Sequence, residues 1–129
     1  MNIIEQKELS LMEEFSDYEL QLLKRDENQA IYIMEYYDFF ISIELNKSFN
    51  LIKFYLLKST DPSRKEKVVS LLNEFNKQSD LATLYLDDEL IILRQQPLTD
   101  NIKLAVDAIY LALLLGGLRD WFTRIKDVI

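Results

Sequence analysis

The sequence predicts an α+β fold in which helices pack on an antiparallel sheet. Segments with apolar residues three and four apart alternate with segments in which apolar and polar residues alternate. Short polar linkers join the strand-like segments, which makes neighbouring strands antiparallel. At 129 residues, 49% of them apolar, the chain suits one core. We expect a single domain over residues 1–129, in the order helix, three-strand meander, helix, two-strand hairpin and C-terminal helix.

The first helix is expected over residues 3–14, where acidic residues separate an apolar face. That face consists of Ile4, Leu11, Met12 and Phe15. Ser16-Asp17 should end the helix. Residues 18–25 fit a continued helical stripe and also a strand, and we favour an irregular or strand-like stretch.

The meander is expected over residues 30–36, 39–46 and 51–57, which are rich in aromatic and β-branched side chains. The middle segment alternates most regularly: it places Phe39, Ile41, Ile43 and Leu45 on one face and Phe40, Ser42, Glu44 and Asn46 on the other. This pattern is typical of a strand with one buried face and one that is mostly solvated.

The middle helix should begin at Asp61, whose carboxylate can accept the free amide protons of the first turn, with Pro62 following. Its apolar face consists of Val68, Leu71, Leu72 and Phe75. Asn73 and Asn76, near its end, are interpreted as structural caps of the helix exit and the next strand, or alternatively as polar contacts with a partner. A hairpin over residues 81–86 and 90–94 follows.

The closing helix is expected over residues 100–115 and resumes after Gly116-Gly117 through residues 120–125. It carries two apolar stripes, so one core cannot easily hide both. The first consists of Ile102, Ala105, Val106, Ile109 and Leu113, and the second of Leu104, Ala108, Leu111 and Leu115. The segment around Trp121 or a second subunit must cover the second stripe. Trp121 and Phe122 are interpreted either as core or as interface anchors. The candidate partner or dimer contacts are therefore the second stripe together with Trp121 and Phe122.

The composition excludes much chemistry, because the chain has no Cys and no His. Disulfides, thiolate nucleophiles, imidazole or thiolate metal sites and the commonest general base are thereby removed. Asp87-Asp88-Glu89 is interpreted as a turn, since it lacks the spacing and glycine of a calcium loop. The pairs Glu13-Glu14 and Asp26-Glu27 are interpreted as solvated surface. We expect no catalytic residue, metal or cofactor. A hydrolase that uses carboxylates alone remains a minor alternative, and it would need a deep pocket.

The net charge of −7 argues against nucleic acid and anionic membranes as partners. The longest apolar run, residues 108–118, is shorter than the roughly 20 residues that cross a bilayer. The first residues lack a signal-peptide pattern, so we expect a cytoplasmic protein. Residues 1–29 carry most of the net negative charge, and this front is either a solvated surface or a patch that steers a basic protein partner.

The segment Leu71-Leu72-Asn73-Glu74-Phe75-Asn76, followed by the acidic hairpin over residues 84–94, resembles the YbjN family, whose fold is like that of type III secretion chaperones. The resemblance implies a small non-enzymatic protein that binds other proteins, often as a dimer, in regulation or as a chaperone. We therefore expect a homodimeric binding module that engages a protein partner through exposed apolar strands and the acidic front. The alternative is an immunity or antitoxin protein that neutralises a basic toxin.

Overall fold

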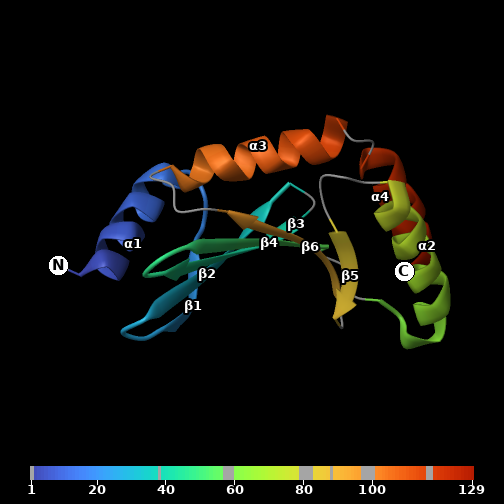
Figure 1. The fold of residues 1–129 in the computed structure, drawn as a ribbon, viewed down its shortest axis with the longest axis horizontal. Coiled ribbons are helices and arrows are strands. Elements are labelled where there is room, and N and C mark those ends of the chain that lie inside the picture. Colours follow the sequence, from blue (N-terminus) through green and yellow to red (C-terminus); the bar gives the residue numbers. More distant parts are fainter. Residues whose placement is uncertain are drawn as a thin grey trace.

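The computed structural model describes residues 2–37, 39–56, 60–78, 83–87, 89–96, 101–115 and 118–129. Its elements form an α+β fold (Figure 1). In chain order they are α1 (Ile3–Glu14), β1 (Gln21–Arg25), β2 (Gln29–Tyr36), β3 (Phe39–Asn46), β4 (Asn50–Leu56), the 3-10 helix η1 (Pro62–Arg64), α2 (Lys65–Gln78), β5 (Thr83–Asp87), β6 (Glu89–Gln96), α3 (Ile102–Leu115) and α4 (Leu118–Val128).

The strands form one antiparallel sheet in the order β1-β2-β3-β4-β6-β5. The meander thus has four strands instead of the expected three, because residues 21–25 pair with β2. All five residues of β1 are exposed, and a register shift between Leu22 and Lys24 interrupts its pairing. A strand with no buried face leaves only a weak alternation in its sequence, which explains the ambiguity of residues 18–25.

One face of the sheet is buried, and the helices cover it (Figure 1). On β3 the residues Phe39, Ile41, Ile43 and Leu45 are at most 1% exposed, as the alternation predicts. On β2 and β4 every second residue is buried in the same way, and the residues between them are mostly half-buried. The buried face and the inner faces of all four helices form one hydrophobic cluster. The described helices leave the opposite face of the sheet open.

Helix α1 has the expected bounds, but one member of its expected apolar face is wrong. Ile4, Leu11 and Phe15 are buried, whereas Met12 is 46% exposed. Glu8 occupies the core face instead, since it lies four residues after Ile4 and three before Leu11.

The buried Glu8 carboxylate, in a residue only 4% exposed, accepts hydrogen bonds from the Arg25 guanidinium and the Tyr32 hydroxyl. Burial and the Glu8 hydrogen bond raise the pKa of Tyr32. The same carboxylate raises the pKa of Arg25. A charged residue therefore ties α1 to β1 and β2.

The middle helical segment begins where the sequence places it. Asp61 is the N-cap of η1, and its Oδ1 accepts the backbone N–H of Ser63 at 3.0 Å. On α2, which follows, Val68, Leu72 and Phe75 are buried while Leu71 is half-buried.

The exit of α2 is fixed to the edge strand by Asn76. Its side-chain amide donates to the Leu84 carbonyl, and its oxygen accepts the Leu84 N–H, both at 2.9 Å. Asn73 is exposed. Asn76 therefore joins α2 to β5.

The closing segment forms two helices, α3 and α4, as the expected helix over residues 100–115 and its resumption through residues 120–125 predict. Figure 1 shows α3 running along the outside of the sheet from the region of α1 to that of α4, and α4 lying beside α2. An ion pair between Arg124 and Glu74, at 3.3 Å, links α4 to α2. Gly116-Gly117 lies outside the described residues.

Candidate functional site

The most exposed apolar surface in the described part of the chain lies on α3. Leu104, Leu111 and Leu115 are 65%, 56% and 80% exposed, and Ala108 between them is exposed too. We call these four residues the α3 stripe. The other side of the helix carries Ile102, Val106 and Ile109, which are buried. The sequence left open whether the segment around Trp121 covers this stripe. That segment is part of α4, and α4 leaves the stripe exposed.

Trp121 and Phe122 pack within the molecule. Phe122 is 9% exposed, and its ring centroid lies 4.6 Å from that of Phe39. Trp121 is half-buried, with its ring 5.9 Å from Phe75 and the Arg124 guanidinium 4.2 Å above it. Of the alternatives that the sequence left open, Phe122 is core, and Trp121 packs α4 onto α2. Phe122 therefore does not belong with the α3 stripe as a partner contact, because it is core, while Trp121 remains partly exposed.

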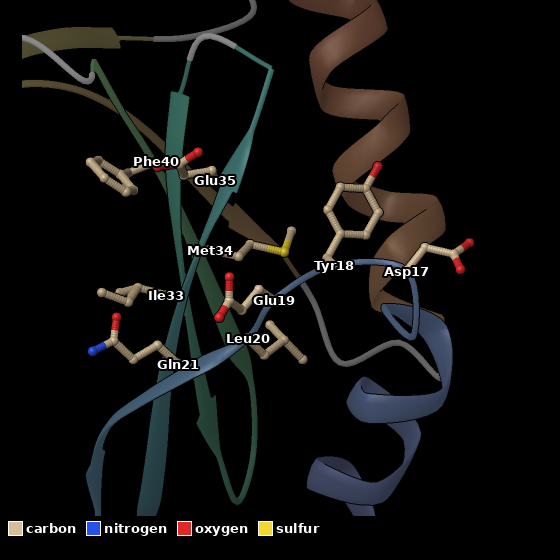
Figure 2. Close-up of a pocket in the computed structure, with 9 residues that line it drawn as sticks. All are labelled: Asp17, Tyr18, Glu19, Leu20, Gln21, Ile33, Met34, Glu35 and Phe40. Carbon is tan, nitrogen blue, oxygen red and sulfur yellow. The ribbon is translucent and has the colours of Figure 1, made fainter.

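A groove of about 660 Å³ lies where β2 extends past the end of β1. Its lining comes from the α1–β1 connection and from the neighbouring parts of β2 and β3 (Figure 2). The lining residues are Asp17, Tyr18, Glu19, Leu20, Gln21, Ile33, Met34, Glu35 and Phe40. Figure 2 shows Ile33 and Phe40 projecting to one side of the sheet and Met34 to the other. We call this feature the β2-edge groove.

The β2-edge groove leaves a short length of strand edge unpaired. β1 pairs with β2 only from Ala30 to Ile33, so in the described residues no strand lies beside Met34–Tyr36 on that side. Unpaired strand edges offer backbone donors and acceptors to another chain. The groove therefore combines a strand edge with apolar side chains.

The rim of the β2-edge groove is acidic. Asp17, Glu19 and Glu35 are exposed, and none of the residues that line the groove is Lys or Arg. Carboxylates beside an apolar floor favour a ligand that carries positive charge and apolar side chains. The groove is open to solvent, unlike the deep pocket that a carboxylate hydrolase would need. This geometry suits a segment of protein better than a small substrate.

Four tyrosines connect the groove to α3. Tyr18 stacks on Tyr36 with ring centroids 5.8 Å apart, and Tyr37 stacks on Tyr110 of α3 at 4.8 Å. Tyr37 is 70% exposed and has a φ of 55°. A residue other than glycine in this region costs about 1–3 kcal/mol and is held there by its surroundings. The rings thus join the α1–β1 connection, the end of β2 with its turn, and α3.

One of these tyrosines, Tyr36, also belongs to a hydrogen-bonded triad. The Tyr36 hydroxyl donates to Asp107 Oδ1 at 2.5 Å, and Lys103 Nζ donates to Asp107 Oδ2 at 2.8 Å. Burial raises the pKa of Asp107, but the two hydrogen bonds outweigh burial and leave that pKa lowered. Burial and Asp107 raise the pKa of Tyr36. The carboxylate is therefore ionised and satisfied at neutral pH, in keeping with a structural role.

The acidic segments that the sequence interprets as turn or surface lie apart from the groove. Asp26 accepts the backbone N–H groups of Asn28 and Gln29, which lowers the pKa of Asp26. Asp87 ends β5 and Glu89 begins β6, while Asp88 lies outside the described residues. Among the residues that the structure describes, no three acidic side chains gather closely enough to hold a metal ion. Of the helices in these ranges, none has the length and apolar character of a membrane span.

Comparisons with family models, with curated proteins and with solved structures found no match for this chain. Of the two candidate surfaces, the sequence identifies the α3 stripe residue by residue. It does not identify the β2-edge groove, whose only sequence signal is the unresolved pattern of residues 18–25. The groove depends on where β1 stops pairing, and that follows from the register of two strands.

Proposed function

We propose that this protein is a non-enzymatic protein-binding module of the cytoplasm, chaperone-like or regulatory, that acts as a homodimer. The α3 stripe carries the proposal. Its leucines are 56–80% exposed on a helix whose opposite side is core. Contiguous exposed apolar surface on an otherwise well-packed protein marks an interaction site. The elements follow approximately the order helix, meander, helix, hairpin and closing helices, which is the order that the proposed resemblance to the YbjN family and to secretion chaperones implies.

The β2-edge groove is the surface that we assign to a different protein. Its unpaired strand edge can hydrogen-bond to an extended segment, and its apolar floor can take alternate side chains of that segment. Its acidic rim selects basic segments and repels acidic ones. A net charge of −7 disfavours nucleic acid and anionic membranes at the same site.

The test is affinity capture from the native organism, with the wild-type chain and two charge variants as bait. Glu35→Lys reverses a charge at the groove, whereas Glu27→Lys reverses an exposed charge in the β1–β2 connection that does not line it. We expect a reproducible protein with a basic segment to bind the wild type and Glu27→Lys, and to bind Glu35→Lys at least tenfold more weakly. Equal capture by all three baits, or no reproducible partner, would overturn the assignment.

A second candidate is an immunity or antitoxin protein, which the acidic rim favours because it complements a cationic toxin surface. The same affinity-capture experiment distinguishes the immunity protein from the binding module. A folded basic nuclease as the single partner, with its activity inhibited by the wild type and much less by Glu35→Lys, would favour the immunity protein. Capture of extended or unfolded basic segments would favour the binding module.

A further inference from the structure

We propose that a second copy of this chain covers the α3 stripe, through an antiparallel α3–α3 pair related by a two-fold axis. This inference rests on the homodimer in the proposed function and deepens it by naming the helix, its occupant and the register. Figure 1 shows α3 along the outside of the molecule, so that a second helix can reach its full length. The four residues of the stripe are exposed in the presence of α1, α2 and α4.

The spacing of the stripe is compatible with a second helix as its occupant. The residue numbers 104, 108, 111 and 115 advance by four, three and four, which is the a/d repeat of two packed helices. The core side of α3, by contrast, carries Ile102, Val106 and Ile109. The exposed α3 stripe is therefore separate from the buried side of α3 that packs in the monomer core.

The stripe is self-complementary under a two-fold rotation. Read backwards, its intervals are again four, three and four. In an antiparallel pair, Leu104 then faces Leu115 of the second copy, and Ala108 faces Leu111. The small alanine is matched with a leucine at both symmetry-related positions, so the two central layers have equal volume. Self-complementarity is what an isologous dimer requires.

Charge also favours a second copy over a basic partner. The α3 stripe itself is uncharged, and the charges beside it, Lys103 and Asp107, are hydrogen-bonded to each other at 2.8 Å. Two copies can therefore approach without placing like charges opposite each other, although each chain carries −7. A cationic partner gains nothing here, since the exposed carboxylates of the groove lie on Asp17, Glu19 and Glu35.

The first experiment measures mass by sedimentation velocity over a range of roughly 1–100 µM, which brackets micromolar association, for the wild type, Leu111→Lys and Leu9→Lys. Leu9 is a matched control, because it is 50% exposed on α1, away from the stripe. We expect wild type and Leu9→Lys to be dimeric and the dissociation constant of Leu111→Lys to rise at least tenfold, with an unchanged circular dichroism spectrum. A monomeric wild type, or a dimer that Leu111→Lys leaves intact, would overturn the proposal.

The second experiment tests the register and does not depend on a destabilising variant. The chain has no Cys, so Leu104→Cys and Leu115→Cys each introduce one thiol. When the two variants are mixed and oxidised, an antiparallel pair gives mainly the disulfide that joins one variant to the other. Predominant disulfides between two copies of the same variant would refute the antiparallel arrangement. The captured basic partner can also show which proposal is wrong. If Glu35→Lys weakens its capture and Leu111→Lys does not, the protein-binding function holds even when the dimer is refuted.

Discussion

Replacing Asn76 by alanine should detach the edge strand β5 from α2. The Asn76 carboxamide donates to the Leu84 carbonyl and accepts the Leu84 N–H, both at 2.9 Å. Among the described strands, β5 pairs with β6 alone, and Leu84 lies opposite Ile92, so the Asn76 side chain takes the place of a neighbouring strand. Leu84 is 4% exposed, which keeps water from replacing both bonds fully.

The expected loss of stability follows from the carbonyl and the N–H of Leu84, which lose their hydrogen-bond partners. Each costs about 1–3 kcal/mol when buried and unsatisfied, and alanine returns roughly 0.6 kcal/mol through its higher helix propensity. We expect Asn76→Ala to lower the free energy of unfolding by about 2–4 kcal/mol, after partial hydration of the carbonyl. Asn73→Ala makes the same substitution at an exposed position three residues earlier, and it should change stability by no more than about 0.6 kcal/mol.

Urea denaturation at one fixed protein concentration measures this difference, since self-association makes stability concentration-dependent. With a slope of about 2 kcal/mol per molar, the midpoint of Asn76→Ala should fall by about 1–2 M relative to Asn73→Ala. The Leu84 amide should also exchange its hydrogen faster in Asn76→Ala. Coincident midpoints, or an unchanged exchange rate at Leu84, would show that the carboxamide bridge contributes little.

Two further predictions concern buried polar groups. Glu8→Ala should lower the free energy of unfolding by about 1–3 kcal/mol, because the buried Tyr32 hydroxyl loses its hydrogen-bond acceptor. The exposed control Glu13→Ala should change this free energy by no more than about 0.5 kcal/mol. Equal urea midpoints for the two variants would contradict the prediction. Because burial and Asp107 raise the pKa of Tyr36 above its ordinary 10.0, its contribution is complete below pH 10 and is lost as pH rises further. The melting temperature of Tyr36→Phe should therefore fall less steeply above pH 10 than that of the wild type, and parallel curves would refute the assignment.

The sequence predicted the elements whose apolar residues are buried on one side. The alternation of β3 placed four core residues correctly, and the four residues of the α3 stripe could be named because one core cannot enclose a helix that is apolar on two sides. β1 was ambiguous since both its faces are exposed. Periodicity could not place Glu8 in the core, because its partners Arg25 and Tyr32 are 17 and 24 residues away.

The β2-edge groove escaped prediction for a related reason. Its shape depends on the residue at which β1 leaves β2, and a register shift inside a five-residue edge strand sets that residue. No single side chain in the groove is unusual for its type. Local pattern therefore identifies a surface when it lies on one helix, and fails when the surface arises from the relative ends of two strands.

The two surfaces depend on different forces. The α3 stripe is uncharged and offers only apolar burial, so its association should be insensitive to moderate salt. The β2-edge groove has an exposed acidic rim, so its affinity for a basic segment should fall as salt screens the charges. Tyr36 lies between the stripe and the groove. It is the last residue of β2, whose edge forms the groove, and its hydroxyl donates a hydrogen bond to Asp107 on α3. If a homodimer built on α3 leaves both grooves accessible, two grooves on one assembly should strengthen binding to a partner with repeated basic segments.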